Sequence, residues 1–257
     1  MRKSLLIIGA VLACGIPAFA QMGGSPGGAN FDNGMEKLFG ANPVFTATMK
    51  TDMSGPQGPM TVKSKMYFDH ENSRTEMNMS DVEGPNLPPG AMAQMQSLGM
   101  DKVVTLTPSD KKTVYVIYPN ISSYAAMPVP APTTTSTAPA QVQLTKIGDE
   151  TVDGHPCVKS KAIVIKDGQT NEFTVWNAND EKNFPIKIAM ADQGMSATIS
   201  FQDISFDAIS ADQFQPPASY KRYSTVQDLM QSVMMSHYGV APAGGASAPT
   251  LSPAPGQ

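Results

Sequence analysis

Apolar and polar residues alternate along much of this chain with a period of two. Between residues 44 and 53, Phe45, Ala47 and Met49 alternate with two threonines and a lysine. A period of two is typical of a β-strand that buries one face. The next segment repeats the pattern, with apolar residues or serine at every even position from 60 to 68. The alternation therefore predicts a mainly β protein.

The longest continuous β pattern runs from residue 143 to 190 and indicates a meander of antiparallel strands. Asp167-Gly168 lies between two of its apolar runs, and this dipeptide favours two-residue hairpin loops. Further strands are predicted at 73–79, 102–107, 113–118 and 195–206. The segment 113–118 is apolar on both faces, so we expect it to be central. Near residues 202–203 the apolar positions change from odd to even numbers, which predicts a β-bulge and a curled sheet.

Three short helices are predicted between and after these strands. The first spans Met35–Phe39, with three apolar residues on one face. The second, residues 91–98, repeats an apolar residue at every third position and is suited to cover the open side of a curved sheet. The third runs from about residue 225 to 237, and Ser224 with Gln227 forms a capping-box pair at its start.

The first 20 residues have the features of a secretory signal peptide. A basic start and a short apolar run precede Ala18-Phe19-Ala20, and cleavage is expected before Gln21. The apolar run is too short to span a membrane as a helix. A second interpretation stays open, in which Cys14 lies in a bacterial lipobox and becomes a lipidated first residue. The protein is thus expected to be periplasmic or secreted, or anchored to a membrane through Cys14.

Composition divides the remainder into one ordered domain and flexible segments. Residues 21–33 are rich in Gly, Pro, Asn and Ser and are expected to be disordered. We expect a single domain over residues 34–238, with a mobile Pro/Thr-rich loop at 126–141. The Ala-, Pro-, Gly- and Ser-rich residues 239–257 are expected to form a disordered tail.

The charge balance argues against two classes of partner, and the cysteine content excludes an internal disulfide. Loss of the signal peptide leaves 16 basic against 22 acidic side chains. That balance argues against nucleic acid or an anionic membrane surface as the main partner. Only Cys157 remains after cleavage before Gln21, so an internal disulfide is excluded. An exported domain of this kind must be stabilised by its apolar core.

No pattern of catalytic or metal-binding residues stands out. His155 and Cys157 are two residues apart, yet no orienting Asn or Asp can be assigned to them, so a structural role is favoured over a nucleophile–base pair. The three histidines lie in three separate elements without zinc-ligand spacing. Methionine is abundant at 18 of 257 residues, which fits an adaptable apolar interior. Thioether binding of Cu(I) is a further hypothesis, because soft ligands select that metal.

Four segments carry a resemblance to a known family. They are Ser73-Arg74-Thr75-Glu76-Met77, the stretch from Ile147 to Cys157, Phe173 to Trp176, and Phe184-Pro185-Ile186-Lys187-Ile188. With them, residues 44–206 resemble an exported bacterial domain family of uncharacterised function. That family is similar in layout to the outer-membrane lipoprotein carrier and receptor of the Lol type. The resemblance implies an open, strongly curved antiparallel half-barrel, with helices capping a concave apolar cavity that accepts acyl chains.

Together these observations predict a non-enzymatic exported binding protein that holds a lipid or a lipid-modified ligand and needs no cofactor. An envelope protein is a further expected partner. The alternatives are a ligand-free structural or interaction module of the cell envelope, and copper binding through methionine. No catalytic residue and no metal ligand is predicted. The expected cavity residues are Val62, Met66, Phe68, Met77, Met79, Met92, Met95 and Trp176.

Overall fold

The computed structural model describes residues 38–39, 42–56, 58–85, 90–110, 112–129, 141–166, 169–192 and 194–239. Within these ranges the chain forms twelve strands, two α-helices and short 3-10 helices. The strands are β1 (Val44–Gly55), β2 (Gly58–Asp69), β3 (Asn72–Glu83), β4 (Lys102–Thr107), β5 (Thr113–Tyr118), β6 (Ser123–Pro128), β7 (Gln141–Val152), β8 (His155–Lys166), β9 (Gln169–Ala178), β10 (Phe184–Asp192), β11 (Met195–Ser205) and β12 (Lys221–Tyr223). The helices are α2 (Ala91–Ser97), α3 (Val226–Tyr238), η2 (Pro119–Ile121) and η3 (Ala211–Phe214).

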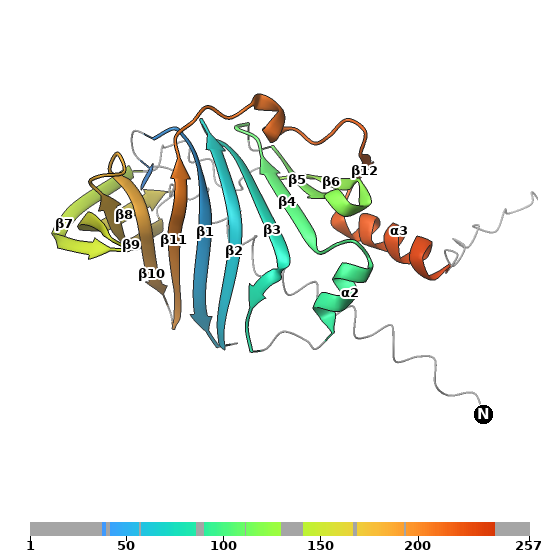
Figure 1. Cartoon of the computed structure of the whole chain (residues 1–257), viewed down its shortest axis with the longest axis horizontal. Coiled ribbons are helices and arrows are strands. Elements are labelled where there is room, and N and C mark those ends of the chain that lie inside the picture. The colour runs from blue at the N-terminus through green and yellow to red at the C-terminus, as the bar shows by residue number, and fades with distance from the viewer. Residues whose placement is uncertain are drawn as a thin grey trace, which may run out of the picture.

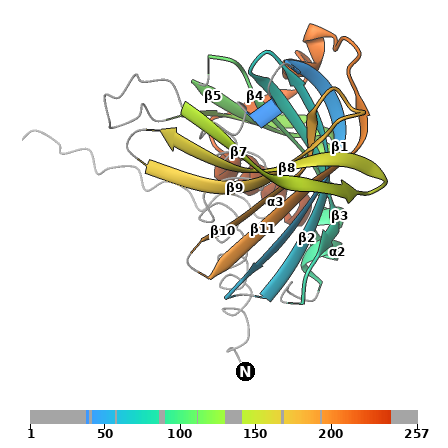
Figure 2. The same ribbon diagram turned by 90° about the vertical axis from the view of Figure 1, so that its left-hand side faces the viewer.

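All twelve strands belong to one sheet in the order β12-β6-β5-β4-β3-β2-β1-β11-β10-β9-β8-β7 (Figure 1). Every pair is antiparallel except β12 with β6. The two outermost strands, β7 and β12, do not pair, so the sheet stays open. It is strongly curved, and β7 to β9 cross in front of α3 when seen from the side (Figure 2). The prediction of a mainly β, open, curved antiparallel half-barrel is confirmed.

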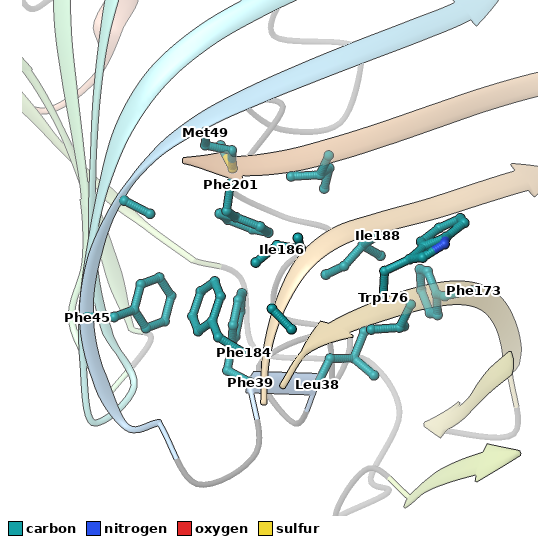
Figure 3. Packing of buried hydrophobic residues seen from close by; sticks show 14 of the residues in the cluster. Leu38, Phe39, Phe45, Met49, Phe173, Trp176, Phe184, Ile186, Ile188 and Phe201 are labelled. Atoms are coloured by element: carbon teal, nitrogen blue, oxygen red, sulfur yellow. The ribbon is translucent and has the colours of Figure 1, made fainter. Parts of the chain in front are cut away.

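One face of this sheet holds an aromatic core inside its curve. Burial alternates along β1 and β2, as the hydrophobic pattern predicts, because successive side chains of a strand point to opposite faces. Phe45 and Phe184 are fully buried, with ring centroids 4.8 Å apart. Phe39, in a 3-10 turn with Leu38, packs against both rings (Figure 3). This core joins β1, β2 and β8 to β11 and fills one end of the curve.

The other end of the same face is covered by helices. Leu229 of α3 is fully buried and packs with Tyr118 and residues of α2 and β4. Thr225 caps α3, since its Oγ1 accepts a bond from the backbone N–H of Asp228 at 3.0 Å. The predicted cap, Ser224, is therefore wrong by one residue. Figure 1 shows α2 and α3 together at this end of the sheet.

The opposite face of β4 and β5 carries a smaller core. Leu106 and Ile117 are buried there and pack with Tyr220, from the segment that leads to β12. Because Val116 and Tyr118 pack beneath α3 on the first face, β5 is apolar on both sides for a structural reason. It lies inside the sheet, between β4 and β6, as its sequence predicts.

One predicted loop boundary differs from the structure, and one predicted β-bulge is confirmed. The expected loop 126–141 starts too early, since Ala126 to Pro128 still pair with β5. Pro128 is tolerated because it ends the strand, where its missing N–H breaks no ladder bond. The predicted bulge is confirmed at Asp203, where Thr46 and Thr48 of β1 face Ser205 and Gln202.

Other expectations fall on residues outside the described ranges. These are the signal peptide, the 21–33 segment, Cys14, most of the helix at Met35–Phe39, the turn at Asp167-Gly168, most of the 126–141 loop and the tail. The hairpin around that turn is nevertheless present, because Lys166 pairs with Gln169.

Candidate ligand-binding face

The side chains on the concave face of β1 to β6 and β11 form continuous rows across the sheet, here called the inner rows. One row runs from Val103 through Met77, Ser64 and Met49 to Phe201. The inner rows comprise Phe45, Ala47, Met49, Thr51, Val62, Ser64, Met66, Phe68, Ser73, Thr75, Met77, Val103, Thr105, Thr107, Val114, Val116, Tyr118, Ser123, Ala125, Met127, Ile199 and Phe201. They connect the aromatic core with the cluster beneath α3.

The inner rows contain no Lys, Arg, Asp, Glu or His. Their only ionisable group is Tyr118, and burial raises its pKa to about 12, so the phenol is neutral at physiological pH. The charged residues of the same strands lie on the opposite face, in outer rows that include Lys50, Lys63, Lys65, Arg74, Glu76 and Lys102. The concave face is therefore made of apolar side chains and neutral hydroxyls.

Two of the inner-row hydroxyls are buried without a hydrogen-bond partner among the described residues. Thr51 is 3% exposed and Ser64 is 8% exposed, and neither Oγ1 nor Oγ is bonded. The two residues are diagonal neighbours, because Ser64 pairs with Met49 and Thr51 pairs with Val62. Buried polar groups are normally satisfied, so this pair is an unusual feature of the face.

A split in the sheet lies next to Ser64. Val62 pairs with Val82, but Ser64 pairs with Met77, so β3 has four residues where β2 has only Lys63. Met79 lies in this bulge and its backbone N–H bonds to the carbonyl of Asp101 at 2.7 Å. The local ladder between β2 and β3 is thus interrupted at the centre of the inner rows.

The predicted cavity residues fall in three places. Val62, Met66, Phe68 and Met77 are on inner rows, and the first three are buried. Met92 and Met95 are half-buried on α2, where Met95 packs against the cluster that includes Leu229. Met79 is half-buried in the bulge. Helix α2 thus borders the cluster beneath α3, whereas Met79 lies between strands β2 and β3 of the sheet.

Trp176 lies apart from these residues. It pairs with Lys159 and Lys187, and their ammonium groups lie 5.0 and 4.8 Å from its ring centroid. Its Nε1 donates to Oε2 of Glu150 at 3.0 Å, and this bond, with Lys159, lowers the pKa of that carboxyl. The indole is at the margin of the aromatic core, beside Phe173 (Figure 3). Its contacts are those of a packed, hydrogen-bonded residue.

His155 and Cys157 make separate interactions. His155 Nδ1 lies 3.0 Å from Oδ2 of Asp180, whereas Cys157 Sγ donates to the carbonyl oxygen of His155 at 3.3 Å. Burial raises the pKa of the Cys157 thiol, and nearby carboxylates raise it further. A protonated, buried thiol is a poor nucleophile. The described residues hold no group of three or more His, Cys, Asp or Glu that could bind a metal ion.

A depression of about 550 Å³ opens mainly on the outer rows of β2 to β4. Lys63, Lys65 and Lys102 line it together with Arg74 and Glu76. Arg74 is already bonded to Glu76 at 2.7 Å. Ser64, Met77 and Val103 of the inner rows also line it, so the depression borders the concave face beside the split between β2 and β3. Its charged outer lining suits an ionic group better than an acyl chain.

Sequence reasoning did not identify Thr51 and Ser64 as candidate site residues. A signal was present for both, because each is a hydroxyl in an otherwise apolar row of an alternating strand. In β2, Ser64 follows Met60 and Val62 and precedes Met66 and Phe68 in the alternation. In β1, Thr51 follows Phe45, Ala47 and Met49.

Residues 45–183 match the family described as a domain of unknown function, DUF4412, and the chain belongs to that family. A comparison with curated proteins gave no match. No helix among the described residues is long and apolar enough to cross a membrane.

Solved structures with a similar layout include a LolA superfamily protein from Nitrosomonas europaea, which is 11% identical with a TM-score of 0.35. The match covers 72% of this chain and 95% of that one. LprF from Mycobacterium bovis is 12% identical, with 77% and 100% coverage and a TM-score of 0.38. The lipoprotein LppX from Mycobacterium tuberculosis is 10% identical, with 72% and 97% coverage and a TM-score of 0.37. These superpositions are partial, and the architecture above rests on this chain's own strand pairing.

Proposed function

We propose that this DUF4412 protein is a non-enzymatic exported binding protein, whose concave face holds a lipid or the acyl chain of a lipid-modified protein. The observation that supports the proposal is the separation of charge across the sheet. The inner rows are free of ionised side chains, whereas the outer rows of the same strands carry many. If both faces of the sheet were exposed to water, ionised side chains would be expected on both faces.

The energetics suit an acyl chain. Burial of each methylene contributes about 0.8 kcal/mol, so a long chain binds without a charged anchor. Met77 is half-buried on an inner row, and Met49 and Met66 are buried on the same face. Methionine side chains are flexible and polarisable and adapt to chains of different shape. Since β7 and β12 do not pair, the sheet is not closed into a barrel.

The first experiment is mass spectrometry of protein made with its own signal sequence in a Gram-negative host. We expect a stoichiometric lipid in the organic extract and a polypeptide that begins at Gln21. A diacylated Cys14 would instead identify a membrane-anchored protein with the same binding face. A clean extract, with no uptake of added lipid, would overturn the proposal in favour of a ligand-free envelope module.

A matched pair of substitutions tests which face binds. Met77 is half-buried on an inner row, and Asn78 is its neighbour on the outer row of β3. Met77→Asp and Asn78→Asp add the same charge one residue apart. We expect Met77→Asp to abolish lipid retention, because an unpaired carboxylate in an apolar site is costly. Asn78→Asp should retain the lipid, and equal retention by both variants would contradict the assignment of the inner face.

A further inference from the structure

The pair of unpartnered hydroxyls on the inner rows implies more about the ligand than its apolar chain. Thr51 and Ser64 are both more than nine-tenths buried, and no group of the described chain satisfies them. They lie side by side at the middle of the concave face, between Met49 and Val62. A purely hydrocarbon ligand would leave both donors unsatisfied, which is unfavourable in a buried site.

The charge of the face limits what the hydroxyls can bind. No cation lies on the inner rows, and the lysines that line the depression with Ser64 lie on the outer rows, so a phosphate or carboxylate on the concave face would have no counter-charge on that face. A neutral acceptor avoids that cost. Diagonal neighbours in an antiparallel pair are about 7–8 Å apart at Cα, close enough for both side chains to address one small polar group.

We infer that Thr51 and Ser64 form a hydrogen-bonding subsite for the neutral carbonyl group of an acyl ester or amide, with the hydrocarbon chain lying along the methionine-lined inner rows. This inference rests on the proposed function. It adds that the ligand is an acyl ester or amide held by its carbonyl. A free hydrocarbon or a charged headgroup would not satisfy this subsite.

The subsite also lies beside the split between β2 and β3. Ser64 is the residue of β2 at which pairing with β3 resumes after the bulge. A carbonyl bound there would have its chain extend along the row toward Met77 and Val103 or toward Met49 and Phe201. The first direction leads beneath α2 and α3, and the second leads to the aromatic core.

The test compares two lipids that differ only in the carbonyl. 1-Oleoylglycerol is an ester, and its 1-O-oleyl ether analogue has the same chain and the same glycerol. Each is titrated against protein loaded with the neutral fluorophore N-phenyl-1-naphthylamine, and displacement gives the dissociation constant. For the wild-type protein we expect the ester to bind about 5–10-fold more tightly than the ether, the range of one or two net hydrogen bonds.

The variant Thr51→Val/Ser64→Ala removes both hydroxyls and keeps the shape of the face. Its ester-to-ether ratio should fall to about 1, while the ether is bound as well as before. Thr46→Val, in the outer row of β1, is the matched control and should keep the wild-type ratio. The melting temperature of the ligand-free double variant should stay the same or rise, because no hydrogen bond is lost.

The outcomes separate this inference from the function on which it rests. Equal affinities of the wild-type protein for ester and ether, or a preference that persists in the double variant, would overturn the carbonyl subsite and leave lipid binding intact. A marked drop in melting temperature of the double variant would show that the hydroxyls have partners within the chain, which also overturns it. Failure of both glycerides to displace the fluorophore would overturn the proposed function together with the subsite.

Discussion

At the scale of single residues, Phe184 is the centre of the aromatic core. Its ring lies within 6 Å of those of Phe39, Phe45, Phe201 and Phe206 by centroid distance. It is fully buried, so Phe184→Ala leaves a cavity that neighbours from three separate segments cannot all fill. We expect a loss of about 3–5 kcal/mol in the free energy of unfolding, measured with urea.

Phe206 provides the control for that substitution. It is only half-buried, and Lys182 covers its ring at 4.2 Å from the centroid. Phe206→Ala should therefore cost less than half as much as Phe184→Ala. An equal or larger loss would show that the core is centred elsewhere.

Tyr118 gives a residue-scale prediction about pH. Its phenol has an ordinary pKa of 10.0, and burial raises it to about 12 in the folded protein. Between these values the unfolded chain has lost the proton and the folded chain retains it. Stability therefore falls as pH rises from 10 to 12, by about 1.4 kcal/mol per pH unit from this group.

Tyr118→Phe isolates that contribution. The variant cannot lose a proton at this position, so its stability should fall less steeply than that of the wild-type protein over the same pH range. The measurement is urea unfolding at several pH values above 9. Parallel slopes for the two proteins would show that Tyr118 ionises normally and is not buried as described.

Some single residues could be assigned from sequence and others could not. Val62, Met66 and Phe68 follow a strict alternation, which fixes their face relative to their neighbours. The contacts of Trp176 could not be predicted in this way. The two lysines beside its ring come from β8 and β10, and alternation within one strand does not identify its cross-strand partners. The same holds for Asp180, which lies 25 positions from His155 yet orients its ring.

At the scale of elements, the start of α3 yields a sharp test. Thr225 Oγ1 accepts the N–H of Asp228, whereas Ser224 is exposed and is the residue that the capping-box pattern selects. Thr225→Ala should cost about 1 kcal/mol of stability, and Ser224→Ala close to none. Thermal unfolding of both variants decides between the two caps, and a larger loss for Ser224→Ala would return the cap to the predicted position.

Element boundaries were predictable where local chemistry determines them. The bulge near residue 203 follows from a change in hydrophobic parity, and that change is readable without the partner strand. The β2–β3 split could not be found in this way, because Met77 and Met79 continue the apolar alternation through it. Strand β12 was also missed, since it has only three residues and pairs in parallel with β6, a pairing set by tertiary contacts.

At the scale of the whole molecule, strand order determines which surface can bind. Alternation predicts that each strand has an apolar face, but an open half-barrel and a closed barrel have the same alternation. The open form follows from the two ends of the order: β12 is short and parallel, whereas β7 is long and, among the described residues, pairs only with β8. One sheet thus has an aromatic core at one end and a helix-covered cluster at the other, and the inner rows between them, where we propose that the ligand binds, carry no ionised side chain.

Hydrogen exchange measures this arrangement directly. Strand β1 is paired along nearly its whole length with β2 and β11, and should exchange slowest. The edge strand β7 is bonded only to β8 and is mostly exposed, so it should exchange fast. Addition of 1-oleoylglycerol should slow exchange in α2 and α3, because a ligand on the inner rows beneath them stabilises the folded state by mass action. Since β7 lies outside the proposed site, its exchange should be unchanged. Protection of β7 with no change in α3 would place the lipid at the sheet edge and contradict binding on the concave face.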